Sequence, residues 1–196
     1  MMDENKHSYA GDSMRRVEDE EMITGAGCYT DDLQFPEMTH LHFVRSPYPH
    51  AKIKKMDLSA AMESEGVLAI YTADDLIRDG VNPYPIPGPP GDFVTQEILD
   101  RGYRNGNGEP MDPPRWLALA KDEVRYVGQP VVAILAESAE NALTASELVE
   151  VDYEELASVG TIQDAEKESA PLIWKGAPGN LLIQMEHGDA AKTDRI

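Results

Sequence analysis

The sequence is poor in thiols, with a single cysteine, Cys28, among 196 residues. One thiol cannot form an intrachain disulfide, and it cannot by itself build a cysteine-based zinc site or an iron–sulfur cluster. Long apolar runs are also absent. No stretch approaches the roughly 18 apolar residues of a membrane span, and the polar start lacks the apolar region of a secretory signal. We therefore expect a soluble, cytoplasmic protein.

Positive charge is scarce as well. The sequence has thirty-six acidic and seventeen basic residues, which gives a formal net charge of -19 at pH 7. A field of this sign repels the phosphates of nucleic acids and the anionic face of a membrane, so we expect no nucleic-acid partner. The hydrophobic content of 41% and the length of the chain suffice for one core of ordinary domain size.

Motifs that carry catalysis are missing. The sequence contains no G-x-S-x-G, no Walker loop and no Cys/His arrangement. Gly25 and Gly27 begin like a dinucleotide-binding G-x-G-x-x-G, but Thr30 stands where the third glycine belongs and no apolar strand precedes them. This pattern favours a plain turn.

Two histidines and several neighbouring carboxylates are the remaining candidates. His40 and His42 share one face of an expected strand, but no third ligand follows at a spacing typical of a metal site, so a half-exposed strand is the better interpretation. The carboxylates are adjacent in sequence, which indicates solvated surface rather than an acid/base pair. They are Asp31–Asp32, Asp74–Asp75 and Glu154–Glu155.

Periodicity and caps predict the strands and helices. "VVAIL" at 131–135 is a continuous apolar run, typical of a strand buried on both faces. Ser138 is placed to cap a helix over 139–148, and "VEVDYEEL" then alternates apolar and acidic side chains as a strand. Earlier, 39–46 and 67–72 are typical of strands, and "AKIKKMDL" is typical of an edge strand with exposed lysines. Together these patterns predict an α+β fold.

Two shorter helices are expected from their caps. Ser59 is placed to cap a helix that ends at Gly66, and Thr72 to cap a helical turn that follows it.

Residues 80–116 differ in composition, because eight of the fourteen prolines lie there. Proline lacks an amide donor and fixes φ, so regular structure is unexpected in this excursion. So long a loop either serves a function, such as contact with a partner, or contains elements that the pattern misses. We favour partner contact, because aromatic and apolar anchors are concentrated in it. They are Tyr84, Ile86, Phe93, Tyr103 and Trp116.

Several motifs occur in an order that resembles a known family. They are "R-x-E-D", "T-G-x-G-x-Y-x-D-D", "V-R-S-P-x-x-H-A-x-I", "V-x-Y-V-G-Q-P-V" and "V-x-V-D-Y-E-x-L". Over roughly residues 15 to 190 the chain is similar to the N-terminal part of the molybdopterin-binding large subunit of the xanthine dehydrogenase, aldehyde oxidase and carbon monoxide dehydrogenase family.

The resemblance implies an α/β-hammerhead domain with a mixed sheet, packed helices and a long Pro-rich loop. Its expected parts are a flexible N-terminus at 1–14, the hammerhead domain at 15–185 and a linker at 186–196 toward a missing cofactor-binding domain. Gly128 would permit the tight turn before the buried strand.

The resemblance also implies what the chain does not do. In the family, the residues that contact molybdopterin and act at molybdenum lie beyond this domain, so we assign no catalytic, cofactor-binding or metal-binding residue. Expected partners are the molybdopterin-binding portion, an iron–sulfur subunit and, in many members, a subunit with FAD. The implied activity of the complex is hydroxylation of a heteroaromatic or an aldehyde, or oxidation of carbon monoxide.

Two questions stay open at this level. The chain is either a fragment of the large subunit or a naturally separate leading subunit. It serves either as a noncatalytic scaffold and assembly part of a molybdenum hydroxylase or as a stand-alone binding or assembly module that reuses the fold.

Overall fold

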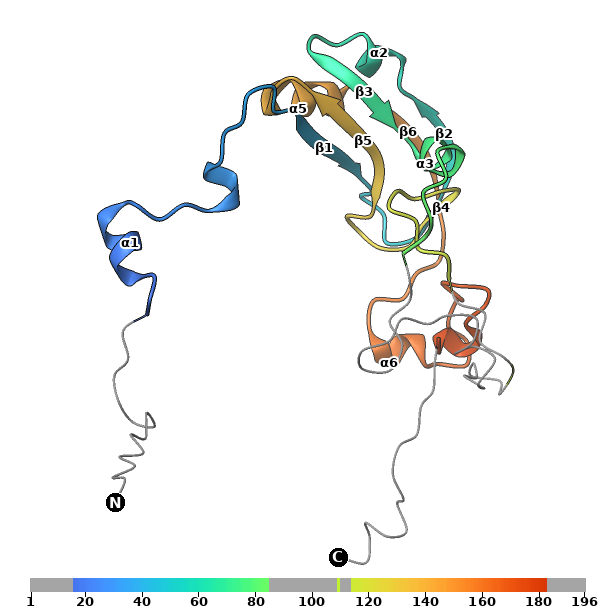
Figure 1. The fold of residues 1–196 in the computed structure, drawn as a ribbon. Helices are drawn as coiled ribbons and strands as arrows, with labels where there is room; N and C mark the ends of the chain where they lie inside the picture. Colours follow the sequence, from blue (N-terminus) through green and yellow to red (C-terminus); the bar gives the residue numbers. More distant parts are fainter. Residues whose placement is uncertain (1–15, 85–108, 110–113, 183–196) are drawn as a thin grey trace, which may run out of the picture. The chain divides into compact units, whose positions relative to one another are not determined.

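The chain forms two compact units, residues 1–38 and 39–196, in a computed structural model that describes residues 16–84, 109 and 114–182 (Figure 1). The expected N-terminus at 1–14 and linker at 186–196 lie outside the described residues.

The first unit contains helix α1 (Asp19–Thr24) and the 3-10 turn η1 (Thr30–Asp32). Acidic side chains fill the first turn of α1, where the helix dipole favours negative charge. Gly25 ends the helix with φ 74°, which confirms the turn expected at the glycines. No described residue of this unit is buried.

The first sheet of the second unit has the strand order β1-β5-β3 and is antiparallel. Its strands are β1 (His40–Arg45), β3 (Val67–Tyr71) and β5 (Pro130–Ala136). The central strand β5 is the apolar run of the sequence, and Val132 and Ile134 have no exposed surface. The prediction of a strand buried on both faces is confirmed.

The second sheet has the order β4-β2-β6 and is also antiparallel. Its strands are β2 (Ala51–Asp57), β4 (Glu123–Val124) and β6 (Glu150–Glu155). The prediction that "AKIKKMDL" is an edge strand is wrong at the start of β2, where Ala51 and Lys52 pair with β4 as well as β6; from Ile53 on, β6 is the one described strand that pairs with it. The lysines mark one solvated face of an antiparallel sheet, and charge on a face does not reveal whether both edges are paired.

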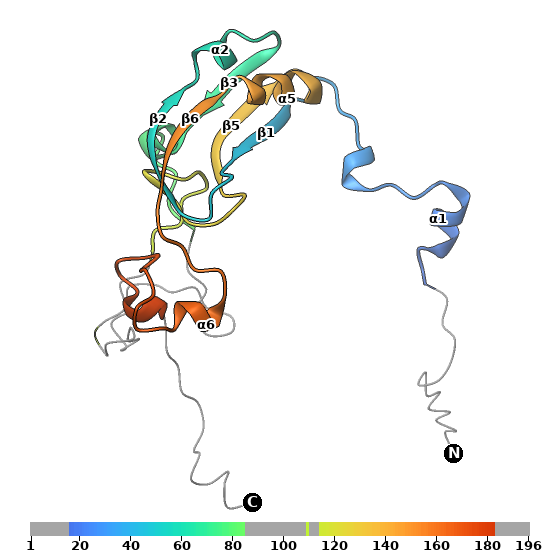
Figure 2. The ribbon, with the colours of Figure 1, turned by 180° about the vertical axis from the view of Figure 1, so that it is seen from behind.

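The expected α+β class is confirmed, but the expected mixed sheet is not, because every described strand pair is antiparallel. Strands β5 and β6 flank helix α5 in sequence yet belong to different sheets (Figure 2). Their side chains explain this separation. The side chains of β5 are apolar on both faces, so both faces must be buried. Those of β6 alternate between half-buried and exposed, which suits a sheet with one solvent-exposed face.

Helix α5 (Ala139–Glu147) packs against β1 and β5. The hydroxyl oxygen of Ser138 accepts the amide of Asn141 at 3.1 Å, so the predicted cap is confirmed. Ala142 and Ala145 are buried, and their small side chains allow the helix to approach the sheet closely.

Short helices connect the strands. In α2 (Ser59–Met62) the cap expected from Ser59 is instead supplied by Asp57, whose carboxylate accepts the Ser59 amide at 3.2 Å. In α3 (Ala73–Arg78) Thr72 precedes the helix as predicted, and the carboxylate of Asp75 accepts its amide and its hydroxyl.

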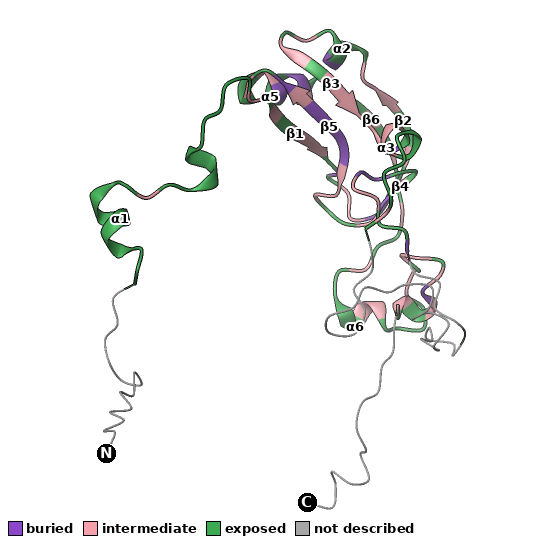
Figure 3. Ribbon diagram, viewed as in Figure 1, coloured by how far each residue is buried: buried purple, intermediate pink, exposed green. Residues whose placement is uncertain are grey.

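The main core lies where the two sheets and α5 meet, and β5 is buried from Val131 to Ile134 (Figure 3). It includes Ala51 and Val124 of the second sheet, Val131 and Val132 of the first, and Ala145 of α5. A smaller cluster, Ala73, Leu119 and Ala133, packs with Phe43 and Tyr71. After β6 the chain continues through α6 (Ile162–Ala165) and η2 (Pro178–Asn180). No helix in the described ranges is long and apolar enough to cross a membrane.

Candidate functional site

Two of the sequence motifs meet where β1 ends and β5 begins, because these strands are antiparallel neighbours. Ser46 donates its amide to the carbonyl of Gln129 at 2.9 Å and accepts the Gly128 amide at 2.8 Å. The guanidinium of Arg45 donates to the Gly128 carbonyl at 2.9 Å. Gly128 has φ 86°, which confirms the tight turn implied by the resemblance.

His50 ties this junction to the chain that follows β6. Its side chain is buried, and Nδ1 lies 2.7 Å from the carbonyl oxygen of Ala157. A carbonyl only accepts, so Nδ1 is the donor in this bond. The amide of Leu156 donates in turn to the His50 carbonyl at 2.9 Å. Local patterns did not indicate a role for His50, although it belongs to the "V-R-S-P-x-x-H-A-x-I" motif.

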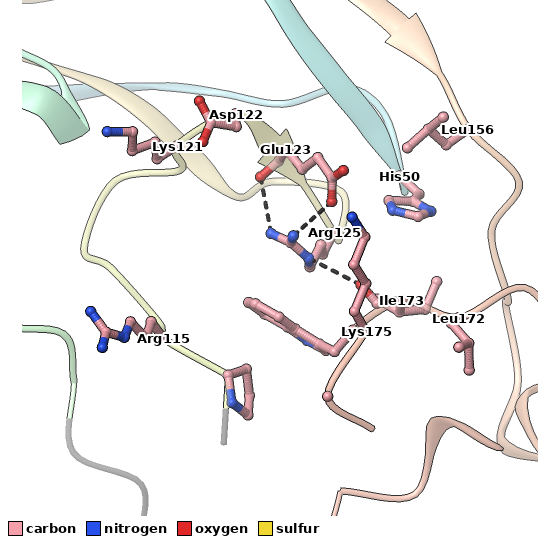
Figure 4. Close-up of a pocket in the computed structure, with 13 residues that line it drawn as sticks. His50, Arg115, Lys121, Asp122, Glu123, Arg125, Leu156, Leu172, Ile173 and Lys175 are labelled. Atoms are coloured by element: carbon pink, nitrogen blue, oxygen red, sulfur yellow. Dashed lines mark hydrogen bonds and ion pairs between the residues drawn. The ribbon is translucent and has the colours of Figure 1, made fainter. Parts of the chain in front are cut away.

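Arg125 holds the segment that precedes η2 (Figure 4). Its Nε donates to the Ile173 carbonyl at 3.1 Å, Nη2 donates to the Glu123 carboxylate at 2.7 Å, and the guanidinium carbon lies 3.9 Å from the centre of the Trp174 ring. Burial lowers the pKa of Arg125, while the charge of Glu123 opposes that change. An arginine in this setting stays charged at every ordinary pH, so it serves as a fixed cationic anchor.

Asn180 organises the same segment from its other end. Its Oδ1 accepts the Ile173 amide at 2.9 Å, and its Nδ2 donates to the carbonyls of Ala165 and Pro171 at 3.1 and 3.0 Å. Asn180 has φ 57°, a conformation that asparagine tolerates better than most residues. The segment 171–180 is therefore closed by side-chain bonds rather than by a sheet.

A cleft of about 550 Å³ lies between these parts (Figure 4). Its basic lining residues are Arg115, Lys121, Arg125 and Lys175, and its acidic ones are Asp122 and Glu123. Apolar walls come from Pro114, Leu156, Leu172, Ile173 and Trp174. The cleft is the candidate functional site, because three motifs of the sequence contribute to it through His50, Arg125 and Leu156.

The described lining of the cleft holds no arrangement typical of nucleophilic catalysis. Among these residues there is no serine or cysteine nucleophile beside a base, and the buried histidine donates to a backbone carbonyl. Within the part of the chain that the structure describes, no group of three or more His, Cys, Asp or Glu residues is arranged to hold a metal ion.

The other sequence candidates lie apart from the cleft or take structural roles. His40 and His42 are half-buried on β1. Asp74 forms an ion pair with Lys121 at 2.7 Å, and Glu154 forms one with Lys54 at 2.8 Å on the exposed face of the second sheet. The interpretation of these two carboxylates as surface residues agrees with their pairing.

Two of the five expected partner contacts can be placed. The Tyr84 amide donates to the Trp116 carbonyl at 2.7 Å, so the two described ends of the 80–116 excursion are joined. Both side chains are exposed, Tyr84 by 61% and Trp116 by 41%. Ile86, Phe93 and Tyr103 lie outside the described residues. Contact of these five residues with a partner stays a prediction.

The fold and the cleft define a class of protein: an α+β domain of two antiparallel sheets whose described residues enclose a cleft. The chain belongs to the family described as aldehyde oxidase and xanthine dehydrogenase, a/b hammerhead domain, whose model matches residues 24–102 and 90–157. The resemblance seen in the motifs is thereby confirmed.

Two proteins to which the chain is similar are named as large subunits. The chain is 34% identical over 164 residues to the nicotine 6-hydroxylase large subunit of Paenarthrobacter nicotinovorans, covering 80% of this chain and 18% of that protein. It is 31% identical over 191 residues to the carbon monoxide dehydrogenase large chain of Hydrogenophaga pseudoflava, covering 91% of this chain and 21% of that one. The chain thus spans about a fifth of the length of these relatives.

Solved structures show the same fold. A Cu,Mo-CO dehydrogenase matches with a TM-score of 0.59 and 32% identity over 83% of this chain and 17% of the other. Quinoline 2-oxidoreductase from Pseudomonas putida 86 matches with a TM-score of 0.60 and 28% identity over 82% of this chain and 18% of the other.

Proposed function

We propose that this chain is a noncatalytic hammerhead domain of a molybdenum hydroxylase, in which it serves as scaffold and as a surface for assembly. The observation that carries the proposal is the family match of a chain that spans about a fifth of relatives named as large subunits. In this proposal the chain contributes one structural domain of a larger protein, and the reaction takes place in the remaining portion.

The cofactor belongs to the remaining portion in this proposal. The described residues gather no group of three or more His, Cys, Asp or Glu side chains that could hold a metal. Molybdopterin would be held by the remaining large-subunit portion, and iron–sulfur and flavin groups by further subunits. The named relatives act on different compounds, such as nicotine and carbon monoxide, so the proposal assigns no substrate. A cytoplasmic location stays a prediction.

Exposed apolar side chains support the assembly role. In the first unit Val17 is 94% exposed and Ile23 is 84% exposed, and Tyr29 and Phe35 are also exposed. Several exposed apolar side chains in a unit with no buried described residue support a surface that a partner covers. Alignments that cover 91% and 94% of this chain reach into this unit, so carbon monoxide dehydrogenase large chains contain a counterpart of it.

Copurification and metal analysis test the proposal. The tagged chain is produced with and without the cofactor-bearing polypeptide of its own enzyme. We expect the two to copurify and molybdenum to follow the cofactor-bearing polypeptide alone. Stoichiometric molybdenum on the isolated chain would overturn the noncatalytic assignment. Failure to associate would favour a stand-alone binding module instead.

A further inference from the structure

The cleft reverses the charge balance of the chain. The whole sequence has 36 acidic and 17 basic residues, whereas the cleft is lined by four basic and two acidic side chains. A recess with low-dielectric walls and one prevailing sign of charge concentrates its field and attracts groups of opposite sign. Although the chain as a whole is acidic, the cleft therefore favours the binding of an anion.

Only two of the four cations are available for a ligand. Arg125 is committed to Glu123 and the Ile173 carbonyl, and Lys121 is paired with Asp74. Arg115 and Lys175 are exposed, and they form no ion pair or side-chain hydrogen bond within the described ranges 16–84, 109 and 114–182. Figure 4 shows them arising from separate segments of the lining.

The apolar walls select the kind of anion. Leu172 lines the cleft with 47% of its surface exposed, beside Ile173 and Trp174. A small inorganic anion leaves these walls wet, whereas a polypeptide segment can place an apolar side chain on them and a carboxylate beside it. Arginine and tryptophan are also the residues that most often anchor protein interfaces.

We propose that the cleft docks an acidic segment of a partner polypeptide, with carboxylates received by Arg115 and Lys175 and an adjacent apolar side chain on Leu172 and Ile173. This inference rests on the proposed function, because the partner is the remaining portion of the same molybdenum hydroxylase. An arginine receives a carboxylate through two parallel hydrogen bonds, and a lysine receives it as a point charge.

A peptide probe tests the cleft independently of the enzyme complex. The full 196-residue chain is titrated into a fluorescein-labelled peptide of alternating glutamate and leucine, and fluorescence anisotropy is followed. We expect binding that weakens as salt rises from about 20 mM to about 200 mM, because exposed charges are screened. The double variant Arg115→Ala/Lys175→Ala should bind about tenfold more weakly.

Matched controls distinguish binding at the cleft from nonspecific electrostatic attraction to the chain. Lys55→Ala removes a cation at an exposed position on the second sheet and should leave affinity within about twofold of the parent. A peptide of alternating glutamine and leucine tests the need for carboxylates. Both cleft side chains are exposed, so the double variant should melt like the parent.

Three results would overturn the proposal. The first is equal affinity of parent and double variant for the acidic peptide. The second is equal affinity of the parent for the glutamine peptide. The third is displacement of the acidic peptide by inorganic phosphate at equal concentration, which would make the cleft a small-anion site. Each can occur whether or not the chain copurifies with a cofactor-bearing polypeptide.

Discussion

At Gly66 the backbone turns with φ 73° directly against Asn141 of α5. A Cβ at this position would overlap the side-chain amide of Asn141, far inside van der Waals contact. Gly80 has a similar φ of 77°, but a Cβ there would meet no atom within 4 Å among the described residues. Alanine at Gly80 therefore measures the backbone strain alone, and alanine at Gly66 measures the strain together with the steric clash.

We expect Gly80→Ala to cost about 1–2 kcal/mol, which is the strain of a left-handed alanine. Gly66→Ala should cost about 1 kcal/mol more, because the Asn141 side chain must rotate away and its Cβ must move slightly. Urea unfolding followed by circular dichroism measures both. Equal losses for the two variants would show that the Asn141 side chain does not resist a Cβ at position 66.

Arg125 is the second residue with a specific consequence. Arg125→Lys keeps the charge but loses the planar stacking on Trp174 and the bond from Nε to Ile173. We expect local opening of 171–180, with a loss of about 1.5–3 kcal/mol for a hydrogen bond from a charged group. In a Trp116→Phe background, emission from Trp174 should shift to longer wavelength. Arg115→Lys is the control, and a red shift there as well would contradict an anchoring role confined to Arg125.

Among the elements, α3 has a pH-dependent start. Hydrogen bonds from the hydroxyl and the amide of Thr72 lower the pKa of Asp75, and Arg78 lowers it further. A carboxyl with a lowered folded-state pKa stabilises the protein above its unfolded pKa of about 3.9, and this stability is lost as pH falls through the folded-state pKa.

Asp75→Asn should therefore lower stability near neutral pH by about 1 kcal/mol, a usual magnitude for a cap. The difference from the parent should shrink as pH falls below about 4. Urea midpoints across pH measure this, with Asp74→Asn as the neighbouring control. Asp74 forms only a surface pair with Lys121, so its loss should matter less. A difference that grew toward low pH would refute this sign.

Strand β5 carries the sharpest prediction at this scale. Val132 has no exposed surface, so Val132→Asp would bury an unpaired charge and should cost several kcal/mol, on the order of 3–5. Leu41→Asp on the edge strand β1, where Leu41 is exposed, should cost far less. Thermal melting compares the two. A Val132→Asp variant that melted like the parent would contradict a central buried strand.

At the scale of the whole molecule, exposed aromatic residues at the base of the 80–116 excursion are expected to serve assembly. Tyr84→Ser and Trp116→Ser remove exposed side chains, so the melting temperature of the chain should change little. Affinity for the cofactor-bearing polypeptide should fall about tenfold, because buried aromatic anchors dominate interfaces. Tyr126→Ser, at another exposed tyrosine, is the control. Unchanged affinity in both variants would remove these residues from the interface.

Local features of this fold followed from local sequence. The apolar run 131–135, the Ser138 cap and the helix after it need only periodicity and a side chain within reach of a nearby amide. The turns at Gly25 and Gly128 follow from the same short-range rules, because each φ lies where glycine is favoured. The order and spacing of the motifs also indicated the family without any knowledge of strand pairing.

Long-range pairing was beyond the sequence alone. The residue pattern of β2 does not predict that β4 pairs with it. The sequence of helix α5 does not predict that the strands before and after it, β5 and β6, belong to two different sheets. The cap of α2 also moved from Ser59 to Asp57, whose carboxylate accepts both the amide and the hydroxyl of Ser59.

The sequence by itself determined the family, the α+β class, the central strand and the acidic character of the chain. Only the tertiary structure decided that His50, Arg125 and Leu156 line one cleft with Arg115 and Lys175. Most of these residues come from separate segments of the chain, and they carry no shared local signal. Their meeting depends on the antiparallel pairing of β1 with β5 and of β2 with β6, and on the anchoring of the 171–180 segment by Arg125 and Asn180.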